Sequence, residues 1–319
     1  KIMHILITGG CGFTGTLLTN DLINLGHKVT VIDTQWFGNY LVAKKKLKII
    51  KADIREYKKI PLKNVDSVVH LAGIANDPSV ELNPRLSWEV NVLATQKLVE
   101  SAITNKVKHF IFASSGSVYG VKKEKEVTEK LSLVPISTYN KTKMIAERIL
   151  KSYEKDIKVH CIRPATVCGF SPRMRLDVSV NMLTYQALKN GKITVFGGNQ
   201  TRPNIHIQDM VNVYKHFLVN KDIPSGCYNA GFENISILEI ANAVSKLIET
   251  EIVITKSNDP RSYRQDSRKL MDTGFKPQYS INDAIREIKE KFEEGMIDGS
   301  DEKYTVKWMK KLGLSELKE

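Results

Sequence analysis

The sequence predicts an α/β protein with a doubly wound parallel sheet and a smaller α/β module toward the C-terminus. Short apolar runs alternate with helical patterns over the first hundred residues, which is typical of parallel strands joined by crossover helices. A glycine-rich turn follows the first apolar run and opens a helix. After residue 164 this alternation gives way to loops and amphipathic helices. At 319 residues and 42% hydrophobic, the chain can bury the core of one large domain or of two unequal ones.

The strands of the predicted sheet are short and mostly apolar. They cover residues 2–7, 28–32, 47–51, 68–71, 109–113 and 158–162, with helices over 14–25, 87–104 and 139–153. A further helix is predicted over 178–189 and a strand over 193–196. We therefore expect a dinucleotide-binding domain over 1–170, to whose sheet 205–230 returns, and a substrate-binding domain mainly over 171–319. Because no linker separates the two, we expect a cleft between them.

Composition argues against several classes of protein. The formal charge is +13, but the lysines are scattered and the longest run is 44–46, which indicates a solvated surface rather than a nucleic-acid site. No run approaches the roughly eighteen apolar residues of a membrane span, and 2–7 is more typical of a strand than of a signal peptide. The four cysteines lack metal-type spacing. We expect a cytoplasmic protein with reduced, buried cysteines and no metal.

The glycine turn after the first strand predicts a dinucleotide site. It fits both Gly-x-Gly-x-x-Gly, with Gly10, Gly12 and Gly15, and Gly-x-x-Gly-x-x-Gly, with Gly9 in first place. Glycines let the backbone turn tightly and approach a pyrophosphate held at the helix N-terminus. Asp33 ends the next strand, where a carboxylate accepts hydrogen bonds from ribose hydroxyls and repels a 2′-phosphate. No Arg or Lys follows it closely, so the sequence favours NAD over NADP.

A serine, a tyrosine and a lysine form the candidate reaction centre. Ser115 follows the strand 109–113, while Tyr139 and Lys143 open a helix at positions i and i+4 and so share one face. The same Tyr-x-x-x-Lys spacing recurs elsewhere, but only Tyr139 starts a helix after such a strand end. We expect the Lys143 ammonium to lower the pKa of the phenol and Ser115 to hold a substrate hydroxyl toward it.

Four other polar residues are less specific. Asp53 either accepts a hydrogen bond from the adenine amino group or caps a helix. His70 ends a strand at the ligand-binding edge of the sheet, before small residues at 71–73, and is interpreted as structural. Asn91 suits either a helix surface or the active site. His206 is interpreted as a strand residue with no chemistry.

The order of these motifs resembles the extended short-chain dehydrogenase/reductase superfamily, and within it the nucleotide-sugar epimerase/dehydratase group, which includes UDP-glucose 4-epimerases. The resemblance rests on the glycine turn, Asp33, Asp53, residues 70–73, 114–120 and 139–143, and Arg163 with Pro164. It implies a Rossmann domain with NAD, a Ser-Tyr-Lys catalytic set, a small domain for a sugar nucleotide, and a homodimer formed by helices near 91–104 and 139–153. The cofactor contacts that it implies are Gly9, Gly12, Phe13, Thr14, Gly15, Asp33, Asp53, Ile54, Leu71, Ala72, Gly73, Ser114, Tyr139, Lys143, Arg163, Pro164 and Val167.

The resemblance also implies a site for the sugar nucleotide. Asn181, Arg202 and Arg261 match family positions that meet the diphosphate, and Ser117 is a further substrate contact. Arginine suits this task because its planar fork of donors pairs with phosphate oxygens bidentately.

The chain departs from the family's pattern beside the catalytic residues. The 4,6-dehydratases carry Asp-Glu directly after the catalytic hydroxyl, and here these positions are Gly116 and Ser117. Dehydration therefore lacks its acid and base. Cys168 replaces a common Tyr, and Asn140 stands where Gly is common after the catalytic Tyr. We expect C4 epimerisation through a keto sugar; the alternatives are a dehydrogenase or reductase and, from another class, a non-catalytic dinucleotide-binding protein.

Overall fold

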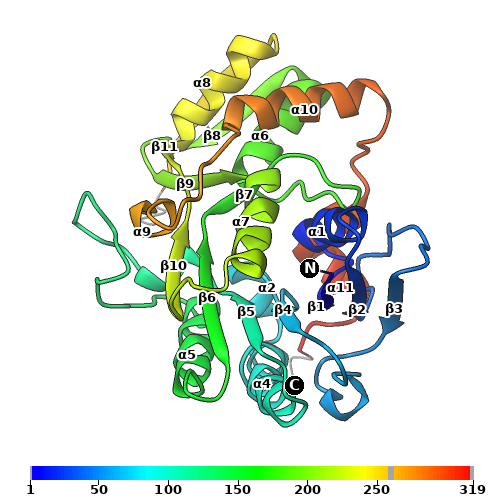
Figure 1. Cartoon of the computed structure of the whole chain (residues 1–319). Helices are drawn as coiled ribbons and strands as arrows, with labels where there is room; N and C mark the ends of the chain where they lie inside the picture. The colour runs from blue at the N-terminus through cyan, green and yellow to red at the C-terminus, as the bar shows by residue number, and fades with distance from the viewer. Residues whose placement is uncertain (1, 258–261, 317–319) are drawn as a thin grey trace.

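A computed structural model describes residues 2–257 and 262–316. Its centre is a seven-stranded sheet, parallel throughout, in the order β10-β6-β5-β4-β1-β2-β3 (Figure 1). The strands are β1 (His4–Thr8), β2 (Lys28–Asp33), β3 (Leu47–Lys51), β4 (Ser67–His70), β5 (His109–Ala113), β6 (Lys158–Pro164) and β10 (Gly226–Ala230). The predicted α/β fold with a doubly wound parallel sheet is confirmed.

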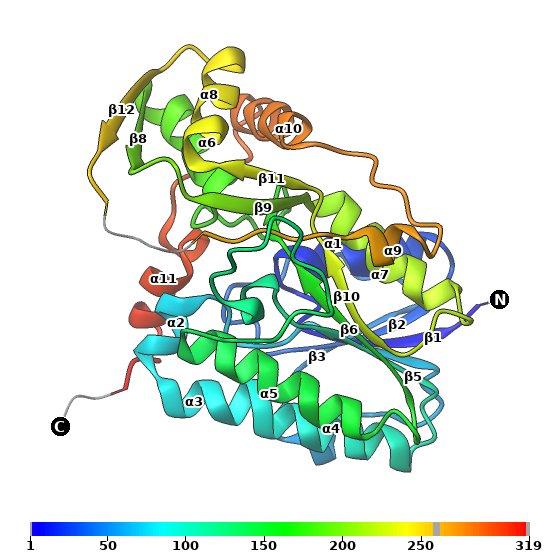
Figure 2. The same ribbon diagram turned by 90° about the vertical axis from the view of Figure 1, so that its left-hand side faces the viewer.

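Helices cover both faces of this sheet because its strands are apolar on both sides. On one face lie α3 (Pro84–Trp88), α4 (Ala94–Thr104) and α5 (Thr138–Ser152), and on the other lie α1 (Phe13–Asn24) and α7 (Ile207–Val219) (Figure 2). Two apolar clusters fill the two sides. One contains Leu18, Leu22 and Phe217, and the other contains Phe110 and Leu150. A π-helical turn, Glu89–Leu93, joins α3 to α4.

The strand order reverses between β1 and β4, and this reversal positions the site. β1 pairs with β2 on one side and with β4 on the other, so the connections leave in opposite directions. In open α/β sheets a ligand binds outside the carboxyl ends of the strands at such a switch point.

Two smaller sheets lie beyond that edge. One has the order β11-β9-β7, formed by β7 (Thr166–Cys168), β9 (Thr201–His206) and β11 (Glu233–Ser236); the other pairs β8 (Lys192–Phe196) with β12 (Glu251–Thr255). The helices α6 (Ser179–Asn190), α8 (Ile237–Leu247) and α10 (Ile281–Glu293) pack with them around a separate apolar cluster. The two views place these elements together above the carboxyl ends of the large sheet (Figures 1 and 2).

The shorter helices α2 (Asp77–Leu82), α9 (Arg268–Met271) and α11 (Thr305–Lys311) complete the chain. Although α11 comes last in the sequence, it packs against α2 (Figure 2). Its Trp308 indole donates to the carbonyl of Trp36, after β2, at 2.6 Å. Within the described residues, no helix combines the length and the apolar character needed to cross a membrane.

Candidate active site

A cavity of about 980 Å³ lies along the carboxyl ends of the large sheet. That volume is at the upper end of the range for ligand pockets. The predicted site residues that line it are Gly9, Gly12, Phe13, Thr14, Gly15, Asp33, Asp53, Ile54, Leu71, Ala72, Gly73, Ser114, Ser115, Ser117, Tyr139, Lys143, Pro164, Val167 and Arg202. One cavity thus brings together the glycine turn, the strand ends and the Ser-Tyr-Lys set.

The glycine turn forms a tight cradle at one end of this cavity. Gly9 has a φ of +73°, and a Cβ there would lie 2.7 Å from the amide nitrogen of Ala72. A Cβ on Gly15 would lie 2.2 Å from the carbonyl oxygen of Gly9. Gly12 gives α1 no side-chain cap, so the first backbone N–H groups of the helix are left for a ligand. This arrangement suits a pyrophosphate.

Asp33 lies beside the turn, with both carboxylate oxygens held by backbone donors. They accept from the amides of Cys11 (3.0 Å) and Gln35 (2.7 Å). Burial raises the pKa of Asp33, while these hydrogen bonds and the charge of Arg173 act to lower it. The Arg173 guanidinium lies over the ring of Phe37 at 4.2 Å and lines the cavity. Sequence reasoning missed this cation because it looked only at the residues directly after Asp33.

The reaction centre forms where α5 meets the end of β5. Ser137 caps α5 by accepting from the amide of Asn140 at 3.2 Å, which places Tyr139 in the first turn. Ser115 lies close enough to the hydroxyl of Tyr139 to lower its pKa as a hydrogen-bonding neighbour. The Lys143 ammonium donates to the carbonyl of Ala113 at 2.9 Å and lies 5.9 Å from the centre of the Tyr139 ring.

Lys143, which was expected to lower the pKa of Tyr139, is not among the groups that shift it in this arrangement. Burial raises the pKa of Tyr139 to about 12, and the charge of Asp77 raises it further. The groups that act to lower it are Ser115, through its hydrogen bond, and Arg175. Burial also lowers the pKa of Lys143 itself, to about 8. The ammonium is directed at a backbone carbonyl and not at the phenol, which accounts for the difference.

Two predicted contacts lie outside the cavity wall. Arg163 lies beneath it, where its guanidinium donates to Glu147 at 2.7 and 2.9 Å. Asn181 uses its amide to hold the loop after β7, through Gly169 (2.9 and 3.1 Å) and the carbonyl of Arg175 (2.9 Å). Both side chains thus support the site from behind. Arg261 lies outside the described residues.

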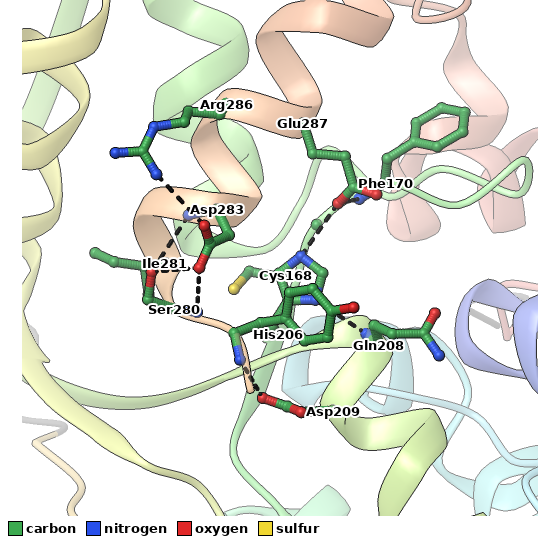
Figure 3. Close-up of polar contacts among 12 residues, drawn as sticks. Cys168, Phe170, His206, Gln208, Asp209, Ser280, Ile281, Asp283, Arg286 and Glu287 are labelled. Carbon is green, nitrogen blue, oxygen red and sulfur yellow. Dashed lines mark hydrogen bonds and ion pairs between the residues drawn. The ribbon is translucent and has the colours of Figure 1, made fainter. Parts of the chain in front are cut away.

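A polar cluster at the base of α10 also fixes that loop (Figure 3). His206, the last residue of β9, accepts from the amide of Gln208 at 3.0 Å and lies 3.2 Å from the carboxylate of Glu287. The same carboxylate accepts from the amide of Phe170 at 3.1 Å, and Tyr279 stacks on the imidazole. These contacts tie α10 to the loop that carries Arg173.

The structure places the other three ambiguous residues. Asn91, in the π-helical turn, bonds both backbone groups of Ile74 and the hydroxyl of Thr142, so it fixes α5 against the loop after β4. His70 is enclosed between two threonine hydroxyls, and burial lowers its pKa to about 3, which keeps it neutral. Asp53 lines the cavity and accepts from the amide and side chain of Arg55.

Two further parts of the wall were not found from the sequence. Helix α11 lines the cavity with Thr305, Val306 and Lys310, although its sequence pattern is only that of a charged amphipathic helix. Arg175 also lines it and pairs with Asp177 at 2.9 Å.

Comparison with known proteins agrees with this geometry. Residues 5–231 match the NAD dependent epimerase/dehydratase family. The chain belongs to this family. The glycine turn, Ser115, Tyr139 and Lys143 all fall inside the matched region.

The family includes several activities among the relatives of this chain. This chain is similar to the UDP-glucose 4-epimerase of Lactobacillus helveticus, with 27% identity over 89% of this chain and 95% of the relative. It is also similar to UDP-glucuronic acid decarboxylase 1 of Xenopus tropicalis, with 27% identity over 95% and 75%. The structure of the Thermus thermophilus UDP-glucose 4-epimerase in complex with NAD superposes with a TM-score of 0.80, at 25% identity over 91% of this chain and 99% of that one.

We predict that Lys143→Met stabilises the protein at pH 7 by about 1–2 kcal/mol, because it removes an ammonium whose burial is unfavourable. Since the pKa of Lys143 is lower in the folded state, the unfolded chain binds more protons between about pH 8 and 10, and wild-type stability rises over that interval. The advantage of the variant therefore shrinks from pH 8 to pH 10.

Chemical denaturation at a series of pH values measures this difference. Lys141→Met, two residues away on the same helix and exposed, is the matched control and should follow the wild type. A Lys143→Met variant less stable than wild type at pH 7 would contradict the assignment of an unfavourable buried charge.

Proposed function

We propose that this protein is an NAD-dependent nucleotide-sugar epimerase that inverts C4 of a UDP-hexose through a transient 4-keto sugar. The observation that carries the proposal is the convergence of Ser115, Tyr139 and Lys143 on a cavity that also contains the glycine turn and Asp33. The names of the relatives support it, since UDP-glucose 4-epimerases occur among both the sequences and the structures.

The residues of the cavity fit NAD. The N-terminus of α1 and the glycine turn would hold the pyrophosphate, and Asp33 the adenosine ribose. Pro164 and Val167 line the same cavity as Tyr139 and would contact the nicotinamide. When bound, NAD accepts a hydride from the sugar carbon and returns it.

The chain's own groups handle the proton and the orientation of the sugar. Tyr139 takes the proton of the C4 hydroxyl as the carbon becomes a ketone, and returns it when the ketone is reduced on its other face. Ser115 holds the C4 oxygen through its hydroxyl. Lys143, with a pKa near 8, is charged at neutral pH and would donate to the nicotinamide ribose.

The wall next to Ser115 argues against a dehydratase. A Cβ on Gly116 would lie 2.4 Å from the amide nitrogen of Gln265, which itself donates to the carbonyl of Arg163 at 2.8 Å. An aspartate at position 116 thus requires this buried glutamine to move. With Ser117 in the next position, neither the acid nor the base of water elimination is present there.

We further propose that residues 171–319 supply most of the sugar-nucleotide site. Arg175 and Arg202 line the cavity and would pair with the diphosphate, and the Arg202 guanidinium lies 5.5 Å from the centre of the Tyr263 ring. This assignment agrees with the fold, because the small sheets and their helices lie beyond the carboxyl ends of the strands of the large sheet.

A homodimer through α4 and α5 is proposed on the family resemblance. Trp88 and Leu93, next to α4, are 36% and 56% exposed, which supports an apolar contact there. Only monomers in sedimentation velocity at micromolar concentration would contradict it.

The test of the proposed function incubates the purified chain and NAD with UDP-glucose, UDP-galactose, their 2-acetamido analogues or UDP-glucuronic acid. We expect one C4 pair to interconvert, and Tyr139→Phe to slow the reaction by roughly 10²–10⁴-fold. Tyr185→Phe is the matched control, because Tyr185 and Lys189 have the same spacing on α6 but do not line the cavity. Stoichiometric NADH with a persistent keto sugar would show a dehydrogenase instead, and loss of carbon dioxide a decarboxylase.

A further inference from the structure

Asn140 is buried directly behind the catalytic residues, and its amide joins a chain of hydroxyls. It is fully buried, and its Oδ1 accepts from the hydroxyl of Ser117 at 2.5 Å. The hydroxyls of Ser117 and Ser115 are 2.7 Å apart, and Ser115 is the hydroxyl neighbour that acts to lower the pKa of Tyr139. The four side chains form one continuous path from the catalytic phenol to a carboxamide.

The proton positions along this path follow from the donor and acceptor capacity of each group. Because Oδ1 of Asn140 can only accept, the single hydroxyl proton of Ser117 is committed to it. The 2.7 Å contact therefore uses the proton of Ser115. Ser115 also accepts from the amide of Ser117 at 3.2 Å, which leaves its second lone pair for the phenol proton of Tyr139. In this state Tyr139 is protonated, and each hydroxyl donates to the next group along the path toward Asn140.

When Tyr139 is a phenolate, the hydrogen bonds along this path must be donated in the opposite direction. Ser115 must then donate to Tyr139, and Ser117 must donate to Ser115, so Ser117 needs a donor in place of Oδ1. Asn140 has one available. Among the described residues, its Nδ2 is buried without any hydrogen-bond acceptor. Rotation of the carboxamide by a half turn directs Nδ2 at Ser117 and gives this group a partner. The oxygen is then left unpaired, which is tolerated better than an unpaired N–H.

We propose that Asn140 is a positioning residue whose carboxamide reverses this chain of hydrogen bonds as Tyr139 gives up and regains its proton. The inference rests on the proposed role of Tyr139 as the catalytic base. It gives a function to a residue that differs from the glycine common in relatives. It also supplies stabilisation of the phenolate that Lys143, bound to the carbonyl of Ala113, does not provide in this arrangement.

Other groups facing Tyr139 stay the same when Asn140 or Ser117 is changed. They are Asp77 from α2, Arg175 from the loop after β7, Tyr214 from α7 and Lys143 on the same helix. A change in the pKa of Tyr139 in these variants therefore reports on the hydrogen-bonded path.

The experiment is a ¹³C NMR titration of the full chain with NAD present, with tyrosine labelled at the carbon that bears the hydroxyl. The Tyr139 signal is identified by its absence in Tyr139→Phe. Asn140→Leu and Ser117→Ala should each raise the pKa of Tyr139 by about 1, since each removes support for a hydrogen bond to a charged oxygen. The double variant should show no more than the larger single effect, because both changes break one path. The side-chain NH₂ signal of Asn140 should move with the same midpoint as Tyr139.

Unchanged pKa values in both variants, or effects that add in the double variant, would overturn the proposal. If Asn140→Leu fails to fold, Ser117→Ala and the Asn140 NH₂ signal in the wild type carry the test. Reduction of bound NAD by the sugar nucleotide should also become about tenfold slower at neutral pH in each single variant. An absence of C4 interconversion by the wild type would count against the proposed function alone, because the NMR titration needs no sugar.

Discussion

The carboxylate of Glu147 holds together the three segments that make the reaction centre. It accepts from the hydroxyl of Ser114 at 2.5 Å and from Arg163 at 2.7 and 2.9 Å, and both members of the ion pair are almost fully buried. Ser114 directly follows β5, Arg163 is the last residue but one of β6, and Glu147 lies on α5 one turn after Lys143. Removing one partner of such a pair costs about 3–5 kcal/mol, because the other charge is left buried alone. The position of Tyr139 over the strand ends depends on this contact.

The burial that fixes the centre also opposes its chemistry. It raises the pKa of Tyr139 and lowers that of Lys143, so each group is driven toward its neutral form. A base that must ionise near neutral pH needs compensation from its neighbours. Here the groups close to the phenol are the hydroxyl of Ser115, supported by Ser117 and Asn140, and the charge of Arg175. Stability and activity therefore make opposite demands on the same few side chains.

Sequence patterns predicted the fold and most of the cavity wall, for a physical reason. The glycine turn, Asp33, Ser115 and Tyr139 each lie at a strand end or at the start of a helix, and parallel topology brings all carboxyl ends to one edge. The residues that were missed reach the site by tertiary packing. Arg173 meets Asp33 from a loop held by Glu287, and α11 returns from the end of the chain to Trp36. No local spacing encodes such contacts.

Two residues that the family resemblance assigns to the ligand site are buried behind it. Arg163 and Asn181 occur at family positions that imply ligand contacts, yet both bind protein groups behind the wall. The expected effect of Lys143 on the pKa of Tyr139 is not seen in this arrangement, because the i, i+4 spacing fixes which face Lys143 shares, but not where its ammonium points. That depends on the carbonyl of Ala113, which belongs to another element.

The most direct test of hydride transfer and return follows deuterium at C4 of the sugar. The substrate, UDP-glucose or whichever UDP-hexose is converted, is labelled at that carbon and incubated with the protein and NAD. An epimerase of this type returns the label to C4 of the inverted product, and an unlabelled substrate run in D₂O gains no deuterium on carbon. Loss of the label to solvent, or deuterium entering from D₂O, would contradict the account, because it would show removal of a carbon-bound proton rather than a hydride.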